Sequence, residues 1–169
     1  MKNIILMGMP GAGKSTLGVV LSKKIGYGFI DSDSVIVARE GKRLCELIDE
    51  LGNEGFLDVE AKVNSAICAS RCVISTGGSA VYRADAINKM KENGIVVYLK
   101  LSFEEICRRL GDLKTRGVVL KKGFTFHDLY EERSPLYERL ADYTVELDGN
   151  SIEENAEKIR EAIACELTE

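Results

Sequence analysis

The sequence has one histidine and no Cys-x-x-Cys pair. A structural zinc site takes four cysteine or histidine ligands in spaced pairs, so we do not expect one here. The five cysteines are odd in number and scattered along the chain, which favours reduced thiols over a disulfide framework. The composition therefore predicts a protein of the reducing cytoplasm.

Long apolar runs and an excess of positive charge are also missing. No segment approaches the roughly 18 apolar residues of a membrane span, and the short apolar run at the N-terminus leads straight into glycines, unlike a signal peptide. The formal net charge is −4, which argues against a general nucleic-acid surface. For this chain of 169 residues we expect a single domain over 1–169, with no membrane or nucleic-acid partner, and a monomer by default.

The chain does contain a regular alternation of short apolar runs and longer helical patterns, which is typical of βαβ units around a parallel sheet. The predicted strands are 3–7, 28–31, 72–76, 95–101 and 143–147. The predicted helices are 15–25, 33–40, 44–51, 54–69, 84–93 and 151–167, with two more after the capping residues Ser102 and Thr125. We expect Gly26 and Gly94 to end helices in the left-handed conformation, and Pro135 to kink its helix.

The strongest motif is segment 8–15, Gly-Met-Pro-Gly-Ala-Gly-Lys-Ser, which fits G-x-x-x-x-G-K-[ST] between a predicted strand and a predicted helix. Glycines let successive N–H groups face a phosphate, and the helix dipole favours the same anion. We expect Lys14 to reach the β- and γ-phosphates of ATP and the Ser15 hydroxyl to bind Mg²⁺. The predicted ATP-binding residues of this loop are Gly8, Gly11, Ala12, Gly13, Lys14, Ser15 and Thr16.

Other nucleotide-binding classes fit the sequence less well. A GTPase would carry an N-K-x-D motif, but the nearest string, 88–91, lacks the aspartate. A D-x-x-G match at 49–52 lies within a predicted helix rather than at a strand end. The third strand does not end in an acidic residue; carboxylates follow the second strand instead.

Asp31 and Asp33 lie where the second predicted strand ends, at the edge that faces the ligand crevice in open α/β sheets. Asp31 is a candidate to reach Mg²⁺ through water. Asp33 is a candidate to accept a hydrogen bond from the hydroxyl that attacks phosphorus. On spacing alone, an equal alternative is that Asp33 caps the helix beginning near Ser34.

Glycines after the third strand and a glycine-broken basic segment give weaker signals. Gly77 and Gly78 permit a ligand to approach the backbone, although the string alone favours an ordinary turn. Segment 111–124 is predicted to be a mobile loop that closes over ATP. In that interpretation Arg116 contacts the transferring phosphate and Arg109 the nucleotide; a solvated loop with scattered charges is an equal alternative.

Arg133 precedes a Ser-Pro-Leu-Tyr string in the last long helical pattern before the final strand. Its guanidinium could hold an anionic acceptor bidentately. Glu131, Glu132 and Glu138 also offer ordinary salt-bridge partners. The residues alone leave both interpretations open.

Together these motifs resemble those of the shikimate kinase family over residues 3–165. The matches are the phosphate loop, the D-x-D pair, part of a glycine triplet, a lid arginine and the E-R-x-P-L-Y string at 132–137. The resemblance implies an α/β P-loop NTPase of the nucleoside-monophosphate-kinase type, with five parallel strands flanked by helices. It also implies a core at 1–32 and 70–110, a substrate-binding region at about 33–60 and a lid at about 111–124.

The resemblance further implies an ATP-dependent kinase that uses Mg²⁺ and phosphorylates a hydroxyl of a small anionic acceptor, shikimate. The implied catalytic residues are Lys14, Asp33 and Arg116, and the nucleotide contacts outside the phosphate loop are Arg109 and Arg116. The implied acceptor contacts are Asp33, Gly77, Gly78 and Arg133. The implied metal contacts are Ser15 and Asp31.

Three positions depart from the family pattern. In the family's G-E-x-x-F-R-x-x-E stretch, Leu57 stands where an arginine would hold the acceptor carboxylate; Ser79 replaces the third glycine, and Gly117 replaces a proline after the lid arginine. Loss of one charge-assisted contact of about 1.5–3 kcal/mol would weaken an anionic acceptor by roughly 10–150-fold. We also expect Leu57 to make that wall of the pocket apolar, so the acceptor site is interpreted as altered.

Alternative functions follow from this departure. Homoserine or gluconate could replace shikimate, because Arg133 alone could hold one carboxylate. A nucleotide-binding regulator would need no acceptor contacts, so the presence of Asp33, Arg116 and Arg133 argues against it. A nucleoside monophosphate kinase would share the fold, but no motif specifies a pocket for a second base.

Overall fold

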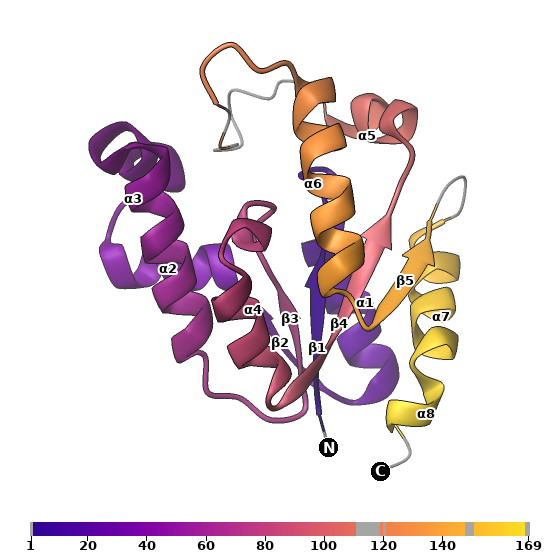
Figure 1. Ribbon diagram of the computed structural model, residues 1–169. Coiled ribbons are helices and arrows are strands. Elements are labelled where there is room, and N and C mark those ends of the chain that lie inside the picture. The colour runs from indigo at the N-terminus through magenta and orange to yellow at the C-terminus, as the bar shows by residue number, and fades with distance from the viewer. Residues whose placement is uncertain (1, 111–118, 120, 148–150, 168–169) are drawn as a thin grey trace.

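The computed structural model describes residues 2–110, 119, 121–147 and 151–167 as an α/β architecture (Figure 1). Its five strands all run parallel, in the order β2-β3-β1-β4-β5. The strands are β1 (Asn3–Met7), β2 (Gly28–Asp31), β3 (Cys72–Ser75), β4 (Gly94–Lys100) and β5 (Tyr143–Glu146). The predicted fold class is therefore confirmed, and the strand positions agree with the sequence to within one residue at each end.

Helices cover both faces of this sheet (Figure 1). On one face α1 (Lys14–Ile25) packs against α7 (Ile152–Ala162), and on the other lie α4 (Ala84–Lys91) and α6 (Phe126–Leu140). Beside the β2 edge, α2 (Ser32–Glu40) packs against α3 (Leu44–Ala66). The remaining short elements are η1 (Ala80–Tyr82), α5 (Phe103–Leu110) and α8 (Ala164–Leu167).

One predicted division of helices is confirmed and one undivided helix needs correction. The predicted break between 44–51 and 54–69 is a kink at Gly52, where φ is 69° and the backbone is non-helical, so α3 consists of two helical segments and ends at Ala66. The predicted closing helix 151–167 is divided into α7 and α8. The α6 helix continues through Pro135 as one element.

One predicted glycine cap is confirmed and the other is wrong. Gly26 ends α1 in the left-handed conformation, with φ of 70°. Gly94 is instead the first residue of β4. A glycine is favoured there because a Cβ would lie 2.7 Å from Ile5 Cδ1 and 3.1 Å from the Asn3 carbonyl oxygen on the neighbouring strand. The close approach of two central strands, rather than helix termination, explains this residue.

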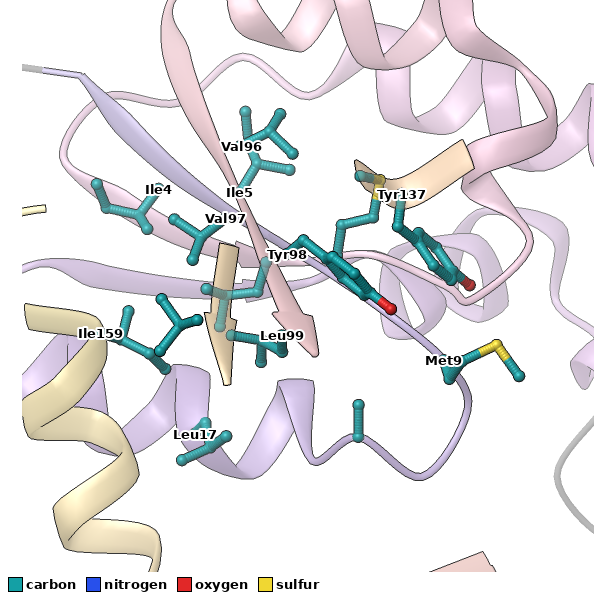
Figure 2. Packing of buried hydrophobic residues seen from close by; sticks show 14 of the residues in the cluster. Ile4, Ile5, Met9, Leu17, Val96, Val97, Tyr98, Leu99, Tyr137 and Ile159 are labelled. Carbon is teal, nitrogen blue, oxygen red and sulfur yellow. The ribbon is translucent and has the colours of Figure 1, made fainter. Parts of the chain in front are cut away.

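The main core lies against the central strands, whose residues are buried on both faces as expected for a parallel sheet. Figure 2 shows Ile5, Val97 and Leu99 within this core, and Tyr98 beside Tyr137 of α6, with ring centroids 5.1 Å apart. This packing fixes α6 against the carboxyl end of β4. Among the described residues, no helix combines the length and the hydropathy that a membrane span requires.

A second, smaller core lies between α2 and α3. It contains Ile36, Leu47, Phe56 and Val63, together with Val119 from the segment before α6. The region predicted to bind substrate, about 33–60, is thus held mainly by its own apolar cluster. The predicted lid, about 111–124, has its residues 111–118 and 120 outside the described part of the chain.

Candidate functional site

A cavity of about 680 Å³ lies across the carboxyl ends of the strands. One part, the P-loop half, is lined by residues 10, 11 and 13–17 together with Arg109, Ile152 and Asn155. The other part, the carboxylate half, is lined by Asp33, Glu60, Arg133 and the turn 76–79, with Leu44, Phe56 and Val119 as apolar surface. Both predicted groups of site residues therefore face one continuous space.

The phosphate loop has the geometry that its glycines predict. Gly8 comes directly after β1 and lies close to β4, so that a Cβ on it would be 2.8 Å from the Leu99 carbonyl oxygen. Gly13, with φ of 86°, is the N-cap of α1 and turns the chain into the helix. Gly8 and Ala12 are buried behind the cavity surface, whereas Gly11, Gly13 and the residues 14–16 line it.

Lys14 is the cation at the centre of the cavity. Its side chain is buried, and Nζ donates hydrogen bonds to the carbonyl oxygens of Gly8 (2.8 Å) and Met9 (3.0 Å). Burial lowers the pKa of Lys14 to about 8, while the charge of Asp33 opposes this change. The ammonium group is thus held by two neutral carbonyls that phosphate oxygens could replace as partners.

Ser15 and Asp31 meet at the edge of the P-loop half. The Ser15 hydroxyl donates to Asp31 Oδ2 at 2.5 Å and lies 3.3 Å from the Ser75 hydroxyl. Asp31 Oδ1 accepts a hydrogen bond from the Ser34 N–H and caps α2. The helix cap that was considered for Asp33 is therefore made by Asp31, which leaves Asp33 facing the cavity.

The hydroxyl–carboxylate pair offers hard oxygen ligands of the kind Mg²⁺ uses, with phosphates and water completing its shell. Within the described part of the chain, no group of three or more His, Cys, Asp or Glu residues forms a metal cluster. The donor set therefore fits a metal bound largely through a nucleotide rather than one held by protein ligands alone.

The carboxyl groups of Asp33, which is partly buried, and Glu60, which is fully buried, converge on Gly77. A Cβ on Gly77 would overlap Glu60 Oε1 and lie 2.9 Å from Asp33 Oδ1. Burial raises the pKa of Asp33, opposed by the charge of Lys14. Burial also raises the pKa of Glu60, to about 7, with a hydrogen bond from Ser79 acting in the opposite direction. Because Gly77 has no side chain, both carboxyl groups can approach the backbone of the turn.

Arg133 brings a guanidinium group, held in place by several contacts, into the carboxylate half. It is 1% exposed, and Nη2 donates to the Val119 carbonyl oxygen at 2.9 Å. Its Nε donates to the Tyr82 hydroxyl at 3.2 Å, and the guanidinium lies 4.9 Å from the Tyr82 ring centroid. Two of the three glutamates considered as its partners pair elsewhere: Glu132 with Lys121 and Glu138 with Lys100. Arg133 therefore keeps a charge available at the cavity.

Arg109 lines the P-loop half from α5, where its Nε donates to Glu105 at 2.7 Å. Arg108 pairs with the same glutamate but is exposed and does not line the cavity. Ile152 and Asn155 of α7 complete this part of the wall. Arg116 and Gly117 lie outside the described residues, so the assignments made to them remain predictions.

Several site residues escaped the sequence interpretation. Glu60 was visible as the last residue of the departing G-E-x-x-F-R-x-x-E stretch, and its four-residue spacing from Phe56 places both on one face of α3. Ile152 and Asn155 gave no local signal. The expectation for Leu57 was wrong: it is buried but does not line the cavity, where Leu44 and Phe56 supply the apolar surface instead.

Comparisons with known proteins identify the family of this chain. The family model described as "Shikimate kinase" matches residues 10–164. The shikimate kinase of Thermodesulfovibrio yellowstonii is 35% identical over 162 residues, covering 94% of this chain and 93% of that protein. The shikimate kinase of Vibrio vulnificus is 37% identical over 161 residues, covering 94% of each.

A solved structure extends the likeness to three dimensions. The shikimate kinase from Acinetobacter baumannii in complex with shikimate has a TM-score of 0.88 and 32% identity, covering 98% of this chain and 94% of that one. The family model and the relatives span nearly the whole chain. The chain belongs to the shikimate kinase family, whose members are ATP-dependent kinases that phosphorylate a hydroxyl.

Proposed function

We propose that this chain transfers the γ-phosphate of ATP to a hydroxyl of shikimate. The observation that carries the proposal is that the phosphate loop and the pair Asp33 and Arg133 line one cavity. A phosphate donor and a small acid can then bind side by side, which is what direct transfer requires. The relative from Acinetobacter baumannii was solved with shikimate bound, which supports the choice of acceptor.

ATP binds in the P-loop half. The loop amides and the start of α1 surround the β-phosphate, and Lys14 exchanges its carbonyl partners for β- and γ-phosphate oxygens. The base lies against Arg109 and Ile152, which face this part of the cavity. Arg116, from the lid, contacts the transferring phosphate.

Ser15 and, through water, Asp31 would hold Mg²⁺ at the edge of the loop. The ion, when bound, neutralises negative charge on the phosphates. The Ser15–Asp31 hydrogen bond keeps both oxygens in place for it.

The acceptor binds in the carboxylate half, with its carboxylate on Arg133. Its reacting hydroxyl donates a hydrogen bond to Asp33, whose raised pKa suits it to take up a proton. The acceptor oxygen forms a bond to the γ-phosphorus while the bond to the β–γ bridging oxygen breaks and ADP leaves. Gly77 and Gly78 allow the acceptor to lie close to the backbone.

These assignments give one kinase domain over 1–169, with its core at 1–32 and 70–110, a substrate-binding region at about 33–60 and a lid at about 111–124. A monomer in the cytoplasm, without nucleic-acid or membrane partners, remains our prediction. A regulator that only binds nucleotide is disfavoured because Arg133 is buried, held by several partners and aimed at a space that such a protein would not need.

An acceptor panel tests the proposal. Purified protein with ATP and magnesium is incubated with shikimate, homoserine, gluconate, AMP or CMP, and ADP formation is followed while mass spectrometry identifies the product. We expect ADP and a singly phosphorylated product with shikimate, and far slower reaction with the others. Turnover of another acceptor in the absence of shikimate turnover would contradict the choice of shikimate.

A further inference from the structure

Glu60 is a buried carboxyl group without a cationic partner in direct contact. It is 1% exposed, and among the described residues no lysine or arginine forms an ion pair with it. One oxygen, Oε1, has no hydrogen-bond partner in the described structure and lies where a Gly77 side chain would be. A buried, unpartnered acceptor atom costs free energy unless something binds to it. Because Glu60 lines the cavity, this unpartnered oxygen is a candidate to accept a hydrogen bond from a donor on a bound ligand.

Ser79 holds the other oxygen of the same carboxyl group. Its hydroxyl donates to Glu60 Oε2 at 2.7 Å, and the serine itself is only 6% exposed at the start of η1. This hydrogen bond joins α3 to the turn after β3 and fixes which way the carboxyl group faces. Ser79 stands where the family pattern has a third glycine, so a glycine there would leave the carboxyl group without this bond.

The charges around Glu60 indicate what the free oxygen can bind. Lys14 from the phosphate loop, Asp33 from α2 and Arg133 from α6 all act on the Glu60 carboxyl. In the proposed function Lys14 contacts phosphate and Arg133 contacts the acceptor carboxylate, so neither is free to pair with Glu60. The acceptor can then offer a hydroxyl as donor, which is the same kind of donor that Glu60 already accepts from Ser79.

We propose that Ser79 is a positioning residue that orients Glu60, so that Glu60 Oε1 accepts a hydrogen bond from a second hydroxyl of the acceptor. The inference rests on the proposed function and goes beyond it. In this arrangement the carboxylate half selects acceptors that carry a carboxylate for Arg133, a reacting hydroxyl for Asp33 and a further hydroxyl for Glu60.

The test compares Ser79→Ala, Ser79→Thr and the wild-type protein by steady-state kinetics. Loss of one hydrogen bond in Ser79→Ala should raise the KM for shikimate by about tenfold, with kcat changed by less than about twofold. The KM for ATP should stay unchanged. Ser79→Thr, which keeps the hydroxyl, should restore most of the affinity for shikimate.

A second arm uses shikimate analogues that each lack one non-reacting hydroxyl. With wild-type protein, removal of the hydroxyl that contacts Glu60 should raise KM by about tenfold. With Ser79→Ala the same removal should cost less than about threefold, because the contact is already impaired. Equal losses in both proteins would contradict the contact.

Ser22→Ala is the matched control. Ser22 is also buried, and its hydroxyl donates to the Val19 carbonyl oxygen at 2.9 Å on α1, outside the cavity. Its removal should leave both KM values unchanged. If Ser79→Thr fails to fold, Glu60→Gln serves in its place: its amide can keep the Ser79 contact but presents N–H to the acceptor, so the KM for shikimate should again rise.

The outcomes separate the inference from the function on which it rests. Wild-type protein that does not phosphorylate shikimate contradicts the proposed function, and the inference falls with it. Wild-type turnover combined with an unchanged KM in Ser79→Ala contradicts the inference alone. A lowered melting temperature with unchanged KM would show that Ser79 only ties η1 to α3.

Discussion

The two halves of the cavity are built in different ways. The phosphate-contacting part of the P-loop half comes from one strand, one loop and one helix that follow each other directly in the chain. The carboxylate half is assembled from α2, α3, the turn before η1 and α6, which are far apart in the sequence. Phosphate binding is therefore encoded locally, whereas acceptor binding depends on how distant helices pack. Change in the acceptor site can then occur without disturbing the nucleotide site.

The largest expected effect is that of a substitution at Asp33, which should impair the carboxylate half and leave the P-loop half intact. Asp33→Asn removes the proton acceptor while keeping the shape of the side chain, so kcat should fall by about 10²–10⁴-fold. ATP affinity, measured by calorimetry, should stay within about threefold of wild type, because the P-loop half does not depend on Asp33 for binding. Asp85→Asn on the exposed start of α4 is the control and should change neither. Unchanged transfer by Asp33→Asn would remove Asp33 from the mechanism.

A substitution at Lys14 should affect both ATP binding and phosphoryl transfer. Lys14→Met removes a preorganised cation from the transferring phosphate, so kcat should fall by roughly 10²–10³-fold, and ATP binding should weaken as well. Lys23→Met, at the other end of the same helix, is the matched control and should leave both unchanged. If kcat fell while ATP binding remained intact, the ground-state contact to phosphate would be wrong.

The pH dependence of the free energy of unfolding should reveal the buried carboxyl group of Glu60 in the carboxylate half. Burial raises the pKa of Glu60 from 4.5 to about 7, so the folded state binds its proton more tightly than the unfolded state. The stabilisation that Glu60 contributes is therefore fully present below pH 4.5 and is lost as pH rises through 7, by up to roughly 3 kcal/mol. Asp33 contributes with the same sign.

Urea unfolding of wild type and Glu60→Gln from pH 5 to 7.5 isolates the Glu60 contribution. The variant should lose most of this slope but keep the part due to Asp33. Lys14 acts in another window: its pKa is lowered to about 8, so stability should rise with pH between about 8 and 10.5. Identical slopes for the two proteins below pH 7.5 would mean that Glu60 is ionised throughout.

The smallest effect is expected for a substitution at Arg133, which should change acceptor binding alone. Arg133→Lys keeps the charge but loses the bidentate geometry, so the KM for shikimate should rise by roughly 10–150-fold while the KM for ATP stays constant. Arg139→Lys on the exposed face of the same helix is the control. An equal rise in both KM values would indicate that α6 positions the whole cavity rather than one half.

The same contrast explains what could be predicted from the sequence. The strands, the phosphate loop and the Asp31–Asp33 pair carry short-range patterns, and the sheet places them as expected. Whether Asp31 or Asp33 caps α2 could not be read from spacing, because either carboxylate lies near the first turn. The contact of Ser79 with Glu60 joins residues on separate elements, so no local pattern could reveal it.

Leu57 and Gly94 show the same limit. Leu57 was assigned to the cavity wall from its place in a motif, but the rotation of α3 directs Phe56 and Glu60 to the cavity instead. Gly94 was assigned to a helix end, but crowding against the neighbouring strand β1 explains it. The rotation of a helix decided the role of Leu57, and the position of a second element decided that of Gly94.

The most direct test of the account measures ADP release in one wild-type sample with ATP and magnesium, first without and then with shikimate. If the two halves act as one site, release should be very slow without the acceptor and should then match the phosphorylated product one for one. Release at the same rate in both stages, or saturable ATP binding without any acceptor-dependent turnover, would contradict the claim that this cavity joins donor and acceptor.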